Sequence, residues 1–234
     1  MTSILEGMIP LRDDVPIRIA PTVTIALVAL NVAVFLYELS LEGQTHGGLE
    51  KFIDSFAVVP RALLAPQPNL RTWLTPFTSM FLHGGFLHIA GNMLYLWIFG
   101  NNVEDLLGHA RYLVFYLFCG LVAMATHVAS APDSSVPMIG ASGAISGVLG
   151  AYAVSYPTAR IRTLIPLGFI WTTVYLPALV LLALWFAMQI LSGALQGSSG
   201  GGVAWWAHVG GFIAGAVLVK PFQVRPPVRA RIPI

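Results

Sequence analysis

A serine flanked by small residues opens one of the apolar segments of this sequence. It belongs to the run Gly140-Ala141-Ser142-Gly143, just inside that segment. A serine at such a place can be a helix cap or a small packing residue, and both are common. It can also be a nucleophile, provided that a base lies within hydrogen-bond reach. The other polar residues of the apolar segments decide between these two interpretations.

His208 is the histidine best placed to be that base. It lies in the first turns of a later apolar segment, where Gly211 and Gly215 have the G-x-x-x-G spacing of closely packed helices. The segment of Ser142 has glycines at similar spacing: Gly143, Gly147 and Gly150. Two such helices can approach until the serine and the histidine touch. The alternative is a histidine that only forms an interhelical hydrogen bond.

A Ser-His dyad is the catalytic arrangement that these residues predict. No Asp or Glu lies inside a span in a place to orient His208, so the acid of the familiar triad is missing. An uncompensated carboxylate would be costly inside a membrane, which makes a dyad the expected form.

His88 and Asn92 are candidate donors to an oxyanion. Their i, i+4 spacing places them on one helix face. Together with the backbone N–H of Ser142 they could stabilise negative charge on a carbonyl oxygen. Ordinary interhelical hydrogen bonding is the alternative for this pair.

A metal site is not predicted. His83, His88 and His208 could be drawn as three ligands, but the sequence offers no acidic or thiolate partner and no H-E-x-x-H pattern. We therefore expect neither a metal nor another cofactor. His83 is expected to stabilise the long loop before it, and Glu104 and Asp105 are expected to be ordinary interfacial charges.

The composition predicts an integral membrane protein. Only 9% of the residues are charged and 56% are hydrophobic, whereas soluble domains carry about 25% charged residues. So little charge cannot coat a globule in water, and lipid is the expected solvent. The sequence has no basic tract suited to nucleic acid, so the expected partners are the bilayer and other membrane proteins.

Six apolar runs approach the length that a bilayer requires. They cover residues 21–39, 86–101, 112–130, 142–157, 167–195 and 204–219. A long mixed segment, 41–81, follows the first run and is expected to lie in the membrane interface. A glycine-rich linker over 196–202 precedes the last run.

The fourth span is too short to cross the bilayer. Ser142 to Ser155 would form a helix of roughly 21 Å, against a hydrocarbon core of about 30 Å. If its far end reaches the surface near Arg160, its N-terminus stops inside the membrane. Its free N–H groups must then line a protein-walled cavity, where they could stabilise an oxyanion. Gly140 and Gly143 would allow backbone and substrate to approach closely.

The basic residues support six spans with both termini in the cytoplasm. Lys51, Arg61 and Arg71 would face outward. The inner side would hold nine basic residues: Arg12, Arg18, Arg111, Arg160, Arg162, Lys220, Arg225, Arg229 and Arg231. Nine against three agrees with the positive-inside rule.

Three motifs, in this order along the chain, resemble those of the rhomboid intramembrane serine proteases. They are 81–92 (FLHGGFLHIAGN), 140–143 (GASG), and 207–211 (AHVGG) with Gly215. The resemblance implies an all-α bundle of six transmembrane helices, with a short central fourth helix and a long interfacial first loop. The predicted division is an N-terminal lead-in over 1–20, the core over 21–221 and a basic tail over 222–234.

The resemblance also implies residue roles. Ser142 resembles the nucleophile and His208 the general base, while His88, Asn92 and the Ser142 N–H resemble the oxyanion donors. Span five and the glycine-rich loop resemble the gate and cap for a substrate helix, and Glu104 resembles a structural acid. The implied substrates are membrane proteins cut at small residues in or near a transmembrane segment. The chain resembles the minimal six-helix form of bacteria and archaea, which implies the inner membrane of such a cell.

Two positions depart from the family pattern. Leu74-Thr75 stands where many rhomboids have Trp-Arg, and Ser146 stands where many have an aromatic that stacks on the catalytic histidine. Two non-enzymatic alternatives remain: a catalytically silent relative that binds transmembrane helices, and a small transporter with a broken helix. Silent relatives usually lack the serine or the histidine, and a transporter would be expected to show repeats or intramembrane charges.

Overall fold

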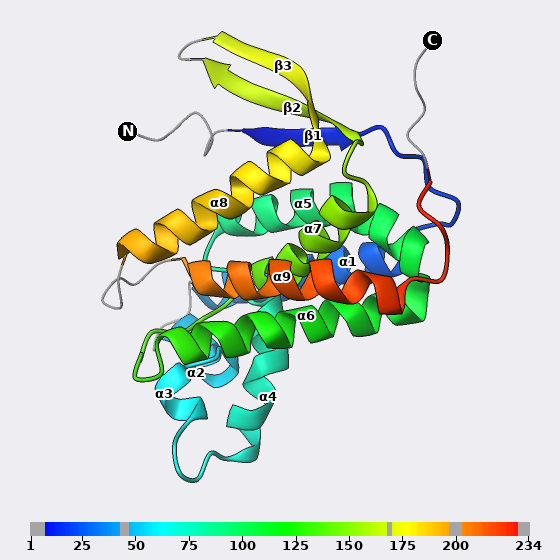
Figure 1. Cartoon of the computed structure of the whole chain (residues 1–234). Helices are drawn as coiled ribbons and strands as arrows, with labels where there is room; N and C mark the ends of the chain where they lie inside the picture. The colour runs from blue at the N-terminus through cyan, green and yellow to red at the C-terminus, as the bar shows by residue number, and fades with distance from the viewer. Residues whose placement is uncertain (1–7, 43–46, 168–169, 197–202, 229–234) are drawn as a thin grey trace, which may run out of the picture.

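The structure is a computed structural model that describes residues 8–42, 47–167, 170–196 and 203–228 of the 234-residue chain. It is mostly helical, and a small sheet lies at one side of the helices (Figure 1). The predicted glycine-rich linker lies outside the described residues, apart from Gln196.

The helices have the following bounds. The long ones are α1 (Thr22–Glu42), α5 (Phe86–Leu107), α6 (His109–Ser130), α8 (Ala178–Gln196) and α9 (Trp205–Phe222), and the shorter apolar one is α7 (Ser142–Ser155). The segment between α1 and α5 contains α2 (Gly48–Phe56), α3 (Pro60–Leu63), α4 (Leu70–Thr78) and a 3₁₀ turn, η1 (Ser79–Phe81).

Three of the described helices are long and apolar enough to cross a membrane by length and composition: α1, α6 and residues 178–195 of α8. α7 is a shorter apolar helix. Together with the composition, these helices identify an integral membrane protein. The count of six spans stays a prediction.

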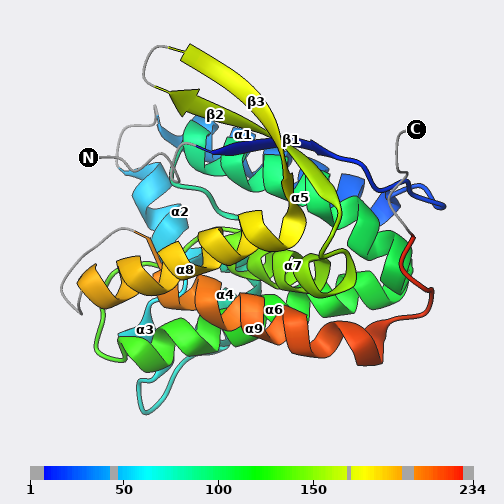
Figure 2. The same ribbon diagram turned by 45° about the horizontal axis from the view of Figure 1, so that its top comes forward.

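α7 lies at the centre of the bundle, with α5, α6, α8 and α9 packed around it (Figures 1 and 2). From Ala144 to Ala153 its side chains are almost all buried. A helix surrounded in this way can be apolar on every side, because no face needs to be polar. The helices packed around it fix where its first residue, Ser142, lies.

A three-stranded sheet corrects the prediction of an all-α fold. The antiparallel strands β1 (Ile9–Asp13), β2 (Arg160–Leu167) and β3 (Ile170–Pro177) follow in that order across the sheet. The apolar run 167–195, predicted as span five, is therefore wrong at its start: helix α8 begins only at Ala178. The residues before it are rich in Thr, Val, Ile and aromatic side chains, which favour strands.

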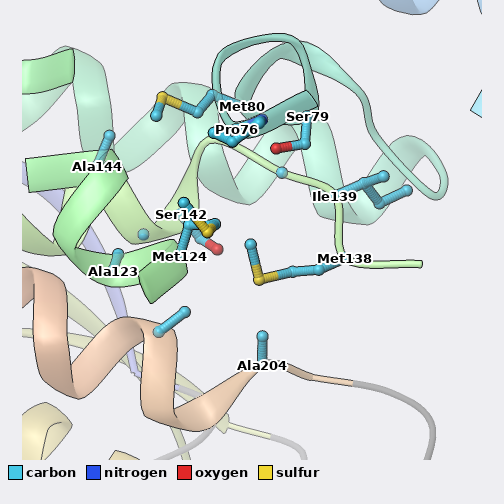
Figure 3. A pocket seen from close by; sticks show the side chains of 14 residues that line it. Pro76, Ser79, Met80, Ala123, Met124, Met138, Ile139, Ser142, Ala144 and Ala204 are labelled. Carbon is cyan, nitrogen blue, oxygen red and sulfur yellow. The ribbon is translucent and has the colours of Figure 1, made fainter. Parts of the chain in front are cut away.

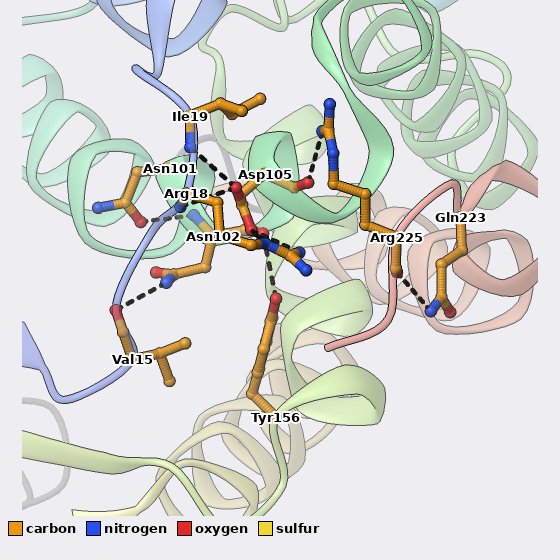
Figure 4. A network of polar contacts seen from close by, with 9 residues as sticks. All are labelled: Val15, Arg18, Ile19, Asn101, Asn102, Asp105, Tyr156, Gln223 and Arg225. Atoms are coloured by element: carbon orange, nitrogen blue, oxygen red, sulfur yellow. Dashed lines mark hydrogen bonds and ion pairs between the residues drawn. The ribbon is translucent and has the colours of Figure 1, made fainter. Parts of the chain in front are cut away.

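A polar network joins both ends of the described chain to α5 (Figure 4). The carboxylate of Asp105 accepts hydrogen bonds from the backbone N–H groups of Arg18 and Ile19, and its Oδ2 lies 2.7 Å from Arg18 Nη2. Arg225 Nη1 donates to the backbone oxygen of Asp105 at 2.9 Å, and Asn102 Nδ2 donates to Val15. Basic residues from both ends of the chain thus gather at one end of the bundle.

Glu104 is buried and caps helix α1. Its carboxylate accepts hydrogen bonds from the backbone N–H groups of Val23 and Thr24 and from the hydroxyl of Thr24, at 2.7–2.9 Å. His109 Nδ1 lies 2.6 Å from Oε1 of this carboxylate, the oxygen that also accepts from Val23. A carboxylate at a helix N-terminus satisfies free N–H groups and the helix dipole. The expectation, from sequence position alone, that Glu104 and Asp105 are ordinary interfacial charges is therefore wrong, because helix α5 continues past the predicted end at residue 101 and buries both. The structural acid that the family resemblance implies agrees with the place of Glu104.

A hydrogen bond ties the sheet to the central helix. The hydroxyl of Tyr152, in α7, donates to Asp13 Oδ2 in β1 at 2.7 Å. Burial raises the pKa of Asp13 to about 6, and the nearby Asp14 adds to the effect. Strand β1 is thereby joined to the helix that begins with Ser142.

Candidate active site

Ser142 and His208 are in direct contact. Ser142 is the first residue of α7, His208 lies in the first turn of α9, and their Oγ and Nε2 atoms are 2.7 Å apart. This is a hydrogen bond of ordinary length for a hydroxyl donor. The structure therefore brings the sequence-predicted serine and histidine together at the distance that proton transfer requires.

Close backbone packing between α7 and α9 sets this distance. A Cβ atom built on Gly215 would overlap the carbonyl oxygen of Gly147, and one on Gly211 would overlap that of Gly143. On the α7 side, a Cβ on Gly150 would overlap the carbonyl oxygen of Phe212. Glycines at these positions let the two backbones touch, as their spacing predicts.

His88 and Asn92 lie on the face of α5 turned to the chain just before Ser142. A Cβ built on Gly140 would lie 2.8 Å from His88 Nε2 and 3.7 Å from Asn92 Nδ2. Gly140 has φ of 120°, a conformation that side-chain-bearing residues rarely adopt, and its N–H donates to Ser79. Glycine is required at 140 both for this backbone turn and for the closeness of His88.

The proton positions on these two side chains suit donation. Gly84 N–H donates to His88 Nδ1 at 3.2 Å, so a neutral ring carries its proton on Nε2. Asn92 is buried, and its Nδ2 has no hydrogen-bond partner among the described residues. A buried donor without a partner is costly, which is explained if an acceptor enters with a ligand.

The backbone at the start of α7 offers a third donor. The first intrahelical hydrogen bond runs from Ile145 N–H to the carbonyl of Ala141, so the N–H of Ser142 has no acceptor within the helix. It lies at the positive end of the α7 dipole. Three candidate donors from two helices therefore lie near the backbone of residues 140–142.

A cavity of about 1230 Å³ opens onto these groups. Its wall includes His88 and Asn92 of α5, Ser142 of α7 and His208 of α9. This volume exceeds that of most small-molecule sites, and it would accommodate an extended peptide. His127 of α6, which the sequence interpretation did not use, also lines it.

A second cavity, of about 20 Å³, lies on another side of Ser142 (Figure 3). Figure 3 shows small side chains and methionines around it, among them Ala123, Met124, Met138 and Ala144. Such a volume holds about one water molecule or a group of similar size.

His83 lies against the ring of His88 and does not line the large cavity. Its ring is buried at 5.1 Å from the ring of His88, and its backbone N–H donates to both carboxylate oxygens of Glu38 at 3.2 Å. Glu38 belongs to α1, so this contact ties the end of the first loop to that helix.

Two residues of α8 that the sequence interpretation did not identify contact His208. Gln189 Oε1 lies 2.7 Å from His208 Nδ1, and the ring centroid of Trp185 lies 5.9 Å from that of His208. The centroid of Trp205 lies 6.2 Å away on another side. A polar residue inside an apolar span, four residues after a tryptophan on the same helix face, was the signal available for Gln189.

Ser146 does not contact the histidine ring as an aromatic would. Its hydroxyl instead donates to the backbone carbonyl of Ser142 at 2.6 Å. The rings of Trp185 and Trp205 are the aromatic neighbours of His208.

The comparisons with known proteins agree with the arrangement of motifs. The Rhomboid domain model matches residues 70–223, which is more than half of the chain. Rhomboid protease GluP of Bacillus subtilis is 31% identical over 86% of this chain and 36% of its own length. Rhomboid protein 1, mitochondrial, of Saccharomyces cerevisiae is 29% identical over 58% of this chain and 37% of its own.

A third relative aligns with a smaller share of this chain. Presenilin-associated rhomboid-like protein, mitochondrial, of Homo sapiens is 33% identical over 36% of this chain and 22% of its own length. The chain thus spans little more than a third of the length of the relatives that it matches most fully. The domain match covers Ser142, His208, His88 and Asn92, and it establishes that the chain belongs to the rhomboid family.

Proposed function

We propose that this protein is an intramembrane serine endopeptidase that cuts transmembrane segments of other membrane proteins through a Ser142–His208 dyad. The observation that carries the proposal is the 2.7 Å contact between Ser142 Oγ and His208 Nε2, at the wall of a cavity large enough for a peptide. The names of the rhomboid protease relatives support the same class of reaction.

The first half of the reaction forms an acyl-enzyme. His208 Nε2 takes the hydroxyl proton of Ser142 while Oγ attacks the carbonyl carbon of the scissile peptide bond. The carbonyl oxygen becomes an oxyanion, and the donors for it are the Ser142 N–H, His88 Nε2–H and Asn92 Nδ2–H. The intermediate then collapses, the C–N bond breaks and His208 gives its proton to the leaving amine.

The second half releases the acyl group. A water molecule attacks the ester carbonyl and gives a proton to His208, and the same donors hold the second oxyanion. The C–Oγ bond breaks, and His208 returns the proton to Ser142. No cofactor takes part in these steps, and Ser142 and His208 return to their starting protonation.

The cavity of about 20 Å³ beside Ser142 supports a preference for small residues on the acyl side of the cut. A methyl or hydroxymethyl side chain is close in size to the water that such a space admits, whereas a leucine or phenylalanine side chain is far larger. A peptide bond within a helix is also shielded, so the substrate must unwind locally at the cut.

The clustering of basic residues supports a topology with both ends of the chain in the cytoplasm. Arg18 and Arg225 meet at Asp105 of α5, and Arg160, the first residue of β2, lies against Asp14. These residues belong to the majority group of the positive-inside count. Within this proposal the membrane is the inner membrane of a bacterial or archaeal cell.

The test is cleavage in a bilayer. The full chain is reconstituted into liposomes with a fusion protein whose transmembrane helix carries alanine and glycine near a helix-breaking residue, and fragments are identified by mass spectrometry. We expect a cut after a small residue of that helix, and a slower cut when leucine replaces that residue. If the substrate helix is bound but stays intact and Ser142 does not react with a fluorophosphonate, the result favours a helix-binding protein instead.

Asn92→Ala is expected to lower kcat by 10²- to 10³-fold, the usual cost of one oxyanion donor. Because Asn92 Nδ2 has no partner in the described structure, its loss should not lower the melting temperature. The matched control on the same helix is Asn102→Ala, which removes the hydrogen bond to Val15 and should lower stability while leaving kcat near its wild-type value. Equal kcat for Asn92→Ala and wild type would remove Asn92 from the oxyanion site.

A further inference from the structure

The side of the His208 ring remote from Ser142 contacts an uncharged acceptor. Gln189 Oε1 lies 2.7 Å from His208 Nδ1, and both side chains are buried, at 6% and 8% exposure. At this depth a hydrogen bond of this length is strong and costly to leave unmade. The contact joins α8 to α9 directly behind the serine–histidine pair.

A second hydrogen bond fixes which end of the Gln189 amide faces the ring. Its Nε2 donates to the backbone carbonyl of Trp185 at 3.2 Å. The nitrogen is therefore on the side of its own helix, and the oxygen faces His208. Because an amide oxygen only accepts, His208 Nδ1 must be the donor in this contact.

The tautomer of His208 follows from this contact. With the proton on Nδ1, the neutral ring presents a lone pair at Nε2, which lies 2.7 Å from Ser142 Oγ. The serine hydroxyl then donates, as a general base requires. The opposite tautomer would place two hydrogen-bond acceptors against each other at Gln189 and would leave Nε2 unable to take the proton.

The aromatic neighbours of His208 restrict the orientation of its ring but do not determine its tautomer. The ring planes of Trp185 and Trp205 lie at 37° and 88° to that of His208, so the ring is bounded on two sides. Neither contact places a hydrogen-bond acceptor at Nδ1. Among the described residues, Gln189 is the side chain that performs this function.

We propose that Gln189 is the positioning residue of the catalytic base. It accepts the hydrogen bond from His208 Nδ1, as aspartate does in serine triads, but it carries no charge. The inference rests on the proposed function, since a base needs positioning only if Ser142 reacts. A neutral amide avoids the cost of a carboxylate inside the membrane. In exchange it stabilises the imidazolium less than aspartate does, so this site depends more on orientation than on charge.

The test compares two replacements at position 189 in the reconstituted cleavage assay. Gln189→Met keeps the length of the side chain but removes the acceptor, so kcat should fall by about 10- to 100-fold while KM stays near its wild-type value. Gln189→Glu restores an oxygen that can accept from Nδ1, so it should keep more activity than Gln189→Met. A carboxylate there would also move the acid limb of the kcat profile to higher pH, by about one unit.

The controls separate positioning from folding. Ile190→Ala changes the next residue on α8, which is 41% exposed on the bundle surface, and should leave kcat and the pH profile unchanged. Melting temperatures in detergent are measured for all variants. If Gln189 has a purely structural role, Gln189→Glu should lower kcat at least as much as Gln189→Met, since it introduces a charge into the same buried space.

The outcomes distinguish this inference from the proposed function. If the wild type cleaves and Gln189→Met has the same kcat, the positioning role of Gln189 is overturned while the proposed function stands. The same holds if Gln189→Glu is no more active than Gln189→Met. Loss of kcat in Gln189→Met at an unchanged melting temperature, with recovery in Gln189→Glu, supports it. Wild-type protein that does not cleave overturns the proposed function first.

Discussion

Replacing Ser142 with alanine is expected to lower the cleavage rate of a transmembrane substrate on the order of 10⁴-fold or more, to the background of hydrolysis in the same liposomes. The reason is that the covalent path disappears: alanine offers no oxygen to attack the peptide carbonyl, and the remaining donors act on an unactivated water. The measurement is the initial rate of fragment formation at saturating substrate.

The Ser142 hydroxyl is hydrogen-bonded to His208, and removing this hydroxyl should leave the fold intact. Ser146→Ala is the matched control on the same helix, because among the described residues its hydroxyl bonds to the backbone carbonyl of Ser142 and not to His208. It should retain most of the activity. The double variant Ser142→Ala, His208→Ala should be no slower than Ser142→Ala, because residues that act as a unit are not additive. Cleavage by Ser142→Ala at the wild-type rate would contradict the dyad.

The second large effect is expected from Gly215→Ala, a change that touches neither substrate nor reacting atoms. The added Cβ would overlap the backbone oxygen of Gly147, so α9 and α7 must separate. Overpacking of this kind costs about 1–3 kcal/mol. His208 lies two turns earlier on α9, and a displacement of about 1 Å between reacting groups can lower a rate by about 10²-fold.

The control for Gly215→Ala is Gly91→Ala on α5, where a built Cβ meets nothing within 4 Å. Thermal unfolding in detergent should show a lower melting temperature for Gly215→Ala and no loss for Gly91→Ala. A Gly215→Ala protein with wild-type stability and wild-type kcat would show that close α7–α9 packing does not set the serine–histidine distance.

The serine and histidine could be placed from sequence because the glycine spacing of their helices predicts close packing. Glycines at i, i+4 spacing predict close helix approach wherever they occur in apolar segments, and the structure does bring Gly211 and Gly215 against the backbone of α7. The short fourth span was predictable for a similar reason, since its length follows from a simple count of apolar residues. Helix α7 begins at Ser142, where the sequence analysis placed it.

The sheet could not be found by counting apolar residues. The run 167–195 contains no charged residue and passes from strand β3 into helix α8, and hydropathy alone does not separate a strand from a buried helix. The available signals were local: Thr172, Thr173 and Val174 favour a strand, and Pro177 precedes the first residue of α8. The predicted fifth span was also longer than a bilayer requires, a mismatch that now has an explanation.

Gln189 was missed, whereas Glu104 received its structural role only through the family resemblance and not from its place in the sequence. A carboxylate is the usual partner of a catalytic histidine, and no carboxylate was suitably placed in the apolar runs. An amide oxygen also accepts from Nδ1, so Gln189 was a candidate of the same kind. Glu104 was interpreted as an interfacial charge because the predicted span ended before it. The helix in fact continues to Leu107, and its N–H partners on α1 are 80 residues away in sequence.

The most direct test of the central claim is to map the residue that reacts with a fluorophosphonate in the folded, reconstituted chain. A serine made nucleophilic by His208 should form one stoichiometric adduct on Ser142, identified by peptide mass, and the adduct should vanish in His208→Ala and in heat-unfolded protein. Loss of substrate cleavage should follow adduct formation one to one. An unmodified Ser142 in protein that still cleaves the transmembrane substrate, or equal labelling with and without His208, would contradict the serine–histidine mechanism.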